Sequence, residues 1–186
     1  MIMKDKVIEV LGLGPSISEY RPSGNFTIGV NDIFRFHPAD GLLLMDPPDS
    51  FSKDRLDIIT DPRHKPGTTY SQLIDWNFMR NFIKIGVVDP ADGGKVDTLD
   101  DLDCLPRHVD STFTAVCIAY HLGASDIVMY GVDFTNHLKY YRNQIIQSYS
   151  RLHGALIQRG VLLWVGTDNS LLSEFIPNWH KTMEVI

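Results

Sequence analysis

The amino-acid sequence predicts a single α/β domain built on a doubly wound, mostly parallel β-sheet. Short apolar runs bounded by Gly, Pro and Asp alternate with stretches of helical periodicity. Such runs are typical of parallel strands covered on both faces, and the alternation is typical of right-handed crossovers between strands. A chain of 186 residues can bury one core, and residues 1–186 show no internal repeat or linker that would divide them.

Each apolar run that we expect to form a strand ends in a turn signal. The predicted strands are residues 7–11, 26–30, 42–45, 56–60, 127–130 and 161–165. Residues 111–122 are apolar almost all round, which predicts a buried helix. A second helix is expected from about 141 to 159, where Ile145, Tyr149, Leu152 and Leu156 share one stripe at helical spacing.

Residues 89–103 interrupt this pattern. The segment holds six Asp and one Lys around two adjacent glycines. A stretch this long and acidic inside a small domain predicts a flexible loop, either a mobile lid or simply disordered chain.

Composition excludes several classes of protein. The formal net charge of -6 argues against a broad nucleic-acid-binding surface, although a local basic pocket for a phosphate is still allowed. Cys104 and Cys117 are too few for a disulfide framework or a four-thiolate zinc site, so we expect reduced thiols in a cytoplasmic protein. The sequence has neither a signal-peptide pattern nor an apolar stretch long enough to span a bilayer.

A glycine-rich turn, Gly12-Leu13-Gly14-Pro15-Ser16, follows the first predicted strand. Glycines let the backbone approach a ligand, and Ser16 could cap a helix whose N-terminal amides attract phosphate. The third glycine of the dinucleotide-binding fingerprint is missing, and Pro15 occupies the turn. A phosphate site and a plain turn therefore both remain open.

Polar residues follow several other predicted strands. Asn31-Asp32, Asp46-Pro47 and Gly131-Val132-Asp133 come directly after strand ends, and Asp110-Ser111-Thr112 begins the buried helix. Ligands of open α/β sheets bind at the carboxyl ends of the strands, so these side chains are expected to face one crevice. Taken singly, each is also an ordinary turn former or helix cap.

The segment after Phe134 gathers groups suited to transfer chemistry. His137 could accept a proton near neutral pH, and Tyr140, Tyr141 and Arg142 could hold a departing phosphate. The alternative for His137 is an exposed bystander. The histidines show no metal-ligand spacing, while Asp46, Asp133 and the acidic loop leave Mg²⁺ binding as an open alternative.

Read together, these motifs resemble the small bacterial sialyltransferases that modify lipooligosaccharide. The motifs are the Gly-Pro-Ser turn, Asn31, Asp46-Pro47, Ser111-Thr112, the strand end at residues 130–134, and a closing strand followed by Asn169-Ser170-Leu171-Leu172. The likeness covers about residues 7–176 and extends, more distantly, to the Rossmann-like family that includes a hydroxymethylpterin diphosphokinase. It implies a Rossmann-like fold that binds a cytidine monophosphate (CMP) sugar and transfers the sugar with inversion, with no metal required.

The resemblance also implies roles for individual residues. The glycine-rich turn from Gly12 to Ser16 would meet the nucleotide phosphate or ribose through Gly14 and Ser16. Asn31 and Asp46 would lie near the phosphate or the sugar. The remaining contacts would come from Ser111-Thr112 at the helix start, from Gly131 with Asp133 around the ribose and base, and from Tyr140 or Tyr141 at the phosphate leaving group.

Two positions depart from the family pattern. Asn143 stands where the family has its general-base His, so His137 or Asp133 would have to assist the acceptor hydroxyl. Asp46 stands where the family usually has Asn, and its charge would repel an acidic donor. Two alternatives follow: Mg²⁺-dependent pyrophosphoryl transfer, or a nucleotide-binding protein without turnover. The expected partners are a nucleotide or nucleotide sugar and a small-molecule or glycan acceptor. Self-association through exposed Trp76, Phe78, Phe82 or Trp179 is left open.

Overall fold

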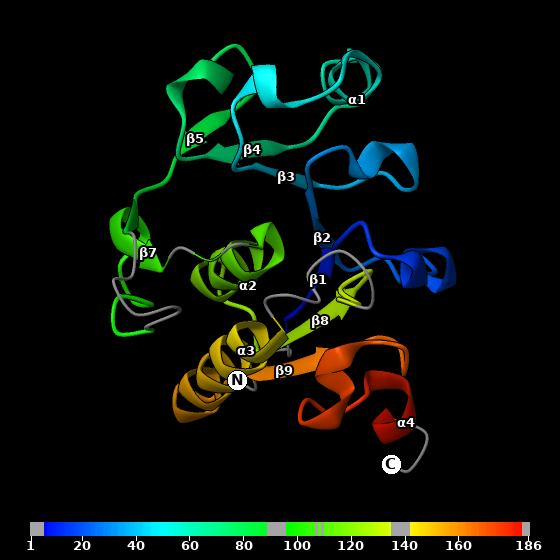
Figure 1. Cartoon of the computed structure of the whole chain (residues 1–186), viewed down its shortest axis with the longest axis vertical. Coiled ribbons are helices and arrows are strands. Elements are labelled where there is room, and N and C mark those ends of the chain that lie inside the picture. The colour runs from blue at the N-terminus through cyan, green and yellow to red at the C-terminus, as the bar shows by residue number, and fades with distance from the viewer. Residues whose placement is uncertain (1–5, 89–95, 107, 109, 135–141, 184–186) are drawn as a thin grey trace.

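The computed structural model describes residues 6–88, 96–106, 108, 110–134 and 142–183. Its centre is a seven-stranded sheet in the order β5-β4-β3-β2-β1-β8-β9, and every neighbouring pair is parallel. The strands are β1 (Val7–Leu11), β2 (Phe26–Val30), β3 (Gly41–Leu44), β4 (Thr68–Ser71), β5 (Phe82–Lys84), β8 (Asp126–Tyr130) and β9 (Leu162–Val165). The predicted α/β class with a doubly wound, Rossmann-like sheet is confirmed (Figure 1).

The direction of strand addition reverses at β1. From β1 the chain builds outward to β5, and then returns to place β8 against the free side of β1 and β9 beyond it. Leu11 at the end of β1 pairs with Gly29 of β2 on one side and with Tyr130 of β8 on the other. Ligands of doubly wound sheets bind beside such a reversal, at the carboxyl ends of the strands.

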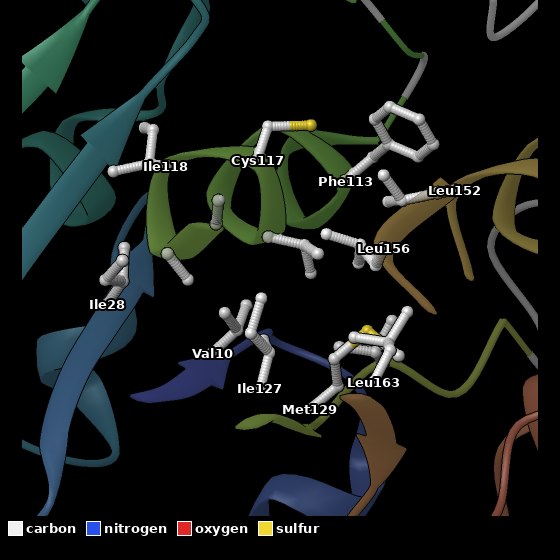
Figure 2. Close-up of a cluster of buried hydrophobic side chains, with 14 of the residues drawn as sticks. Val10, Ile28, Phe113, Cys117, Ile118, Ile127, Met129, Leu152, Leu156 and Leu163 are labelled. Atoms are coloured by element: carbon white, nitrogen blue, oxygen red, sulfur yellow. The ribbon is translucent and has the colours of Figure 1, made fainter. Parts of the chain in front are cut away.

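Alternate side chains of the central strands enter two separate cores. Val10 of β1 and Ile127 of β8 belong to the larger core, whereas Leu11 and Val128 belong to the core on the other face. The larger core lies beneath α2 (Ser111–His121) and α3 (Arg142–Gln158), as Figure 2 shows. Both of these helices were predicted. Burial on both faces explains why the central strands read as continuous apolar runs.

The remaining elements are short. The other α-helices are α1 (Lys53–Ile59) and α4 (Trp179–Met183), and a small parallel pair is formed by β6 (Val87–Val88) and β7 (Leu105–Pro106). The 3-10 turns are η1 (Pro15–Glu19), η2 (Ile33–Arg35), η3 (Pro48–Ser50), η4 (Ile74–Trp76), η5 (Leu102–Cys104) and η7 (Leu171–Glu174). None of the helices in the described part of the chain is long and apolar enough to cross a membrane.

The strand predicted at residues 56–60 is wrong, because this segment belongs to helix α1. Leu56 and Ile59 are one helical turn apart and both pack into the smaller core, while Asp57 is exposed. The sheet instead gains β4 and β5, which the prediction missed. Fully buried Thr69 and Ser71 make β4 too polar to stand out as an apolar run.

Trp76 is not an exposed contact residue, as the sequence suggested. Its side chain is fully buried in the smaller core, where it meets the Phe51 ring edge-on at 5.9 Å between centroids. Phe78, by contrast, is 62% exposed. A large aromatic ring in a polar stretch of sequence can be buried or exposed, and only the tertiary packing decides which.

The described half of the acidic segment is attached to the helices. Leu99 is fully buried in the larger core, and Asp100 forms an ion pair with Arg159 at 2.5 Å while accepting a hydrogen bond from Tyr120. Residues 89–95 lie outside the described part of the chain. The flexible loop predicted there stays a prediction.

Candidate functional site

A cavity of about 600 Å³ lies at the carboxyl ends of the central strands. Its volume is within the usual range for small-molecule sites. Eight residues that the sequence singled out for nucleotide binding or catalysis line it: Gly14, Pro15, Asn31, Asp46, Ser111, Thr112, Gly131 and Asp133. They come from the ends of β1, β2, β3 and β8 and from the start of α2. Parallel strands that end at one edge of the sheet bring them together.

Ser16 lies behind the cavity wall rather than in it. Its side chain is 3% exposed, and both its backbone N–H and its hydroxyl donate to the Asp133 carboxylate, the N–H at 2.7 Å. The same hydroxyl accepts a hydrogen bond from the N–H of Gly131 at 3.2 Å. Ser16 lies within η1 and does not cap it. It therefore holds Asp133, which itself lines the cavity.

Gly12 and Gly131 allow the ends of β1 and β8 to touch. A Cβ on Gly12 would lie 2.4 Å from the carbonyl oxygen of Gly131, and one on Gly131 would lie 2.5 Å from that of Gly12. Gly131 also has φ +66°, a left-handed conformation that favours glycine. The close approach of these two backbones is the reason for the glycines here.

Three amides of the glycine-rich turn, those of Gly12, Gly14 and Ser16, are already engaged. The N–H of Gly12 donates to the Tyr130 carbonyl at 2.8 Å, and the N–H of Gly14 donates to the Gly131 carbonyl at 2.7 Å. Pro15 has no N–H, and that of Ser16 donates to Asp133. These amides hold the turn against β8, so they are not free to surround a phosphate as the sequence suggested.

The N-terminus of α2 is capped by Asp110, which confirms the helix-cap alternative. The Asp110 carboxylate accepts hydrogen bonds from the N–H groups of Thr112 at 3.2 Å and Phe113 at 3.1 Å. The hydroxyls of Thr112 and of Tyr149, from α3, also donate to this carboxylate. Burial beside Asp110 raises the pKa of Tyr149 well above its ordinary value, so the phenol keeps its proton.

His108 also contacts the Asp110 cap of α2. Its ring stacks on Phe113 at 4.8 Å between centroids, and Nδ1 accepts a hydrogen bond from the N–H of Asp110 at 3.3 Å. Burial lowers the pKa of His108, which favours the neutral ring that this acceptor role requires. His108 does not line the cavity, so we assign it to the support of the cap.

Two cations in the cavity wall, Arg35 and Arg55, were not predicted from the sequence. Both approach Asp32, which is 4% exposed: Arg55 donates to Oδ1 from Nε at 2.9 Å and from Nη2 at 2.6 Å, and Arg35 lies 3.5 Å from Oδ2. The spacing of Arg35 three residues after Asp32 was a usable signal. Arg55 gave none, because it lies directly before residues 56–60, which were predicted as a strand and instead belong with it to helix α1.

Asn31 and Asp46 contribute polar groups from neighbouring strand ends. Asn31 has φ 51°, and its N–H donates to the Leu43 carbonyl at 3.0 Å. Its Oδ1 is buried and has no hydrogen-bond partner among the described residues. Asp46 is exposed, and its main chain is held by the Trp76 indole, which donates to the Asp46 carbonyl at 2.8 Å.

Three predicted catalytic residues, His137, Tyr140 and Tyr141, lie outside the described residues, so their roles stay predictions. Asn143 is exposed in the first turn of α3 and does not line the described cavity wall. Within the described ranges, no three His, Cys, Asp or Glu side chains gather as metal ligands would.

Solved structures with the same arrangement of elements include the sialyltransferase CstII from Campylobacter jejuni in complex with CMP. The match has a TM-score of 0.61 at 14% sequence identity and covers 93% of this chain and 84% of that one. The chain has the fold of the bacterial sialyltransferases. The resemblance seen in the sequence motifs is thus confirmed at the level of the fold.

Two further structures extend the sialyltransferase likeness. The CST-II complex with a trisaccharide acceptor and CMP matches with a TM-score of 0.57 at 14% identity, covering 93% of this chain and 86% of that one. The monofunctional alpha-2,3-sialyltransferase Cst-I from Campylobacter jejuni matches with a TM-score of 0.57 at 12% identity, covering 96% and 82%. No protein-family model and no curated protein sequence matches the chain.

Proposed function

We propose that the chain binds a CMP-sugar-like nucleotide donor in the cavity at the carboxyl edge of its sheet and transfers the sugar to a glycan or small-molecule acceptor. The observation that carries this proposal is the convergence of Gly14, Asn31, Thr112 and Asp133 on one cavity of about 600 Å³. The sialyltransferase fold adds support, because neighbours with that fold were solved with CMP and with a trisaccharide acceptor.

The two sides of the cavity suit different parts of such a donor. Gly14, Thr112, Gly131 and Asp133 surround the junction of β1, β8 and α2, where we assign the nucleoside. Both carboxylate oxygens of Asp133 accept hydrogen bonds from Ser16, which holds them in a constant position. A fixed carboxylate of this kind can accept hydrogen bonds from ribose hydroxyls. Asn31, together with Asp46, follows β2 and β3 and would meet the sugar.

The proposed reaction is an inverting displacement. The acceptor hydroxyl attacks the anomeric carbon, the bond from that carbon to the phosphate oxygen breaks, and the nucleotide leaves with the bonding electrons. His137 would take the proton of the acceptor hydroxyl, and Tyr140 or Tyr141 would donate hydrogen bonds to the departing phosphate. These three assignments rest on the sequence.

A nucleotide-binding protein without turnover is the second candidate. It is favoured by Asn143, an exposed amide at the start of α3 where the family has its general base. An amide cannot accept a proton at physiological pH. The two candidates predict the same binding and differ in turnover.

Isothermal titration calorimetry with CMP, UMP, GMP and AMP, with and without Mg²⁺, tests the binding step. We expect CMP to bind most tightly without Mg²⁺, and Asn31→Ala to weaken that binding with the fold intact. Asn77→Ala is the matched control, since Asn77 is exposed and does not line the cavity. If no nucleotide binds, the proposal is wrong. Release of CMP from CMP-sialic acid in the presence of glycan acceptors then separates the enzyme from the binding protein.

A further inference from the structure

The cavity carries its positive charge on one side. Among its described lining residues the cationic side chains are Arg35, at the end of η2, and Arg55, on α1. Arg35 follows the end of β2, and Arg55 follows the end of β3. Their side chains are 45% and 36% exposed, whereas that of Asp32 between them is 5% exposed. The guanidinium groups therefore stay accessible while their anchor is buried.

The two guanidinium groups are held in place. Nε and Nη2 of Arg55 both donate to Oδ1 of Asp32, and its guanidinium carbon lies 4.9 Å from the centroid of the Phe51 ring. Arg35 meets the other carboxylate oxygen at 3.5 Å. Two cations against the Asp32 carboxylate leave one surplus positive charge in this cluster, while Asp46 carries a negative charge after the end of β3. Nη1 of Arg55 and most N–H groups of Arg35 are not used in these pairs.

The opposite side of the cavity, among its described lining residues, carries carboxylates and no cationic side chain. The turn amides at Gly12, Gly14 and Ser16 donate to protein acceptors, and the amides of Thr112 and Phe113 in α2 donate to Asp110. The carboxylates of Asp110 and Asp133 line the cavity on this side. Like charges a few ångströms apart repel, so this side disfavours an anionic group.

We propose that Arg35 and Arg55 bind the anionic group of the ligand, with Asp32 as the positioning residue that holds both guanidinium groups. The ligand group is a phosphate or a carboxylate, since a planar guanidinium donates paired hydrogen bonds to either. This inference rests on the proposed function, because the anion is that of the donor: its nucleotide phosphate or the carboxylate of an acidic sugar.

Calorimetric titration of cytidine, CMP and CMP-sialic acid at low ionic strength tests the inference. Arg35→Gln is the primary variant, because Asp32 keeps its closer partner Arg55 and the fold should survive. Arg55→Lys is the second, since it keeps the charge near Asp32 and loses the paired geometry. Arg63→Gln is the matched control: Arg63 pairs with Asp61 on the surface, and its side chain is 86% exposed. Circular dichroism verifies that each variant is folded.

Either source of the anion gives a distinct result. If the phosphate binds here, both variants weaken CMP about tenfold or more and leave cytidine unchanged. If the sugar carboxylate binds here, CMP keeps its affinity and CMP-sialic acid loses about tenfold. Equal affinities of Arg35→Gln, Arg55→Lys and the wild type for all three ligands would overturn the inference while leaving the proposed function intact. A wild-type protein that binds none of them would overturn both.

Discussion

The carboxylate of Asp133 accepts hydrogen bonds from both the backbone N–H and the hydroxyl of Ser16, a residue 117 positions earlier in the chain. This contact joins the turn after β1 to the end of β8, beside the point where Gly12 and Gly131 touch. The two central strand ends of the sheet are thereby fixed to each other.

The hydrogen bonds of Ser16 should contribute measurably to stability. Ser16→Ala leaves the buried Asp133 carboxylate with one donor fewer, so we expect the free energy of unfolding to fall by about 2 kcal/mol. Urea denaturation monitored by circular dichroism measures the change. Ser18→Ala is the control, because the exposed Ser18 hydroxyl bonds only to the Pro15 carbonyl, and it should cost less than about 0.5 kcal/mol. Equal losses of unfolding free energy in Ser16→Ala and Ser18→Ala would refute the stabilising role of the Ser16 hydrogen bonds.

Alanine at Gly131 should be strongly destabilising. The new Cβ would lie 2.5 Å from the Gly12 carbonyl oxygen, at a backbone angle of φ +66°. We expect a loss of more than about 2 kcal/mol in the free energy of unfolding. Gly154→Ala is the opposite case, because Gly154 lies inside α3 with nothing within 4 Å of its would-be Cβ. The free energy of unfolding of that variant should rise by about 0.5 to 1 kcal/mol. A tolerated Gly131→Ala would contradict the close approach of the two strand ends.

The buried Tyr149 phenol should make stability fall at alkaline pH. Burial raises the pKa of Tyr149 well above 10 in the folded chain, whereas the unfolded phenol ionises near its ordinary pKa. Stability is therefore complete below pH 10 and declines above it, because the unfolded state loses its proton first. Tyr149→Phe removes this part of the decline. Between pH 8 and pH 11 the free energy of unfolding of this variant, measured by urea titration, should fall by about 1 kcal/mol less than that of the wild type.

Burial also raises the pKa of Tyr130, to about 12. Tyr130 is present in both proteins, so its contribution to the alkaline decline cancels in the comparison. Identical pH dependence of Tyr149→Phe and the wild type would show that the phenol at position 149 ionises normally.

Asp46→Asn should strengthen the binding of an acidic donor. Asp46 is exposed at the cavity wall and carries a negative charge near the sugar of the proposed donor. Removing that charge is expected to tighten CMP-sialic acid about fivefold, and the gain should shrink at high salt. Calorimetry against Asp49→Asn, an exposed neighbour in η3 that does not line the cavity, controls for the change in net charge. Unchanged binding by Asp46→Asn would place the donor away from Asp46, and weaker binding would contradict the predicted repulsion.

Apolar runs and their turn signals were enough to predict the class of fold. The five runs at 7–11, 26–30, 42–45, 127–130 and 161–165 all form strands of the sheet. Burial on both faces accounts for the largely apolar central strands β1, β2, β3 and β8, whereas β9 is an edge strand in which Leu162 is exposed. The same logic placed Gly14, Asn31, Thr112 and Asp133 at one edge. Parallel strands end on the same side, so residues after them converge whatever their separation in sequence.

Contacts between distant segments decided the rest. The local pattern could not identify helix α1, because a short apolar run fits a strand as well as a helix. It could not identify strand β4 either, because buried Thr69 and Ser71 are polar and resemble a loop. Whether the amides of the Gly14 turn face a ligand or the protein depends on where β8 lies. Likewise, Arg55 approaches Asp32 from 23 positions away. Hydrogen bonds and ion pairs across such distances exist only once the sheet is assembled, which is why the charge distribution of the cavity is a property of the folded chain.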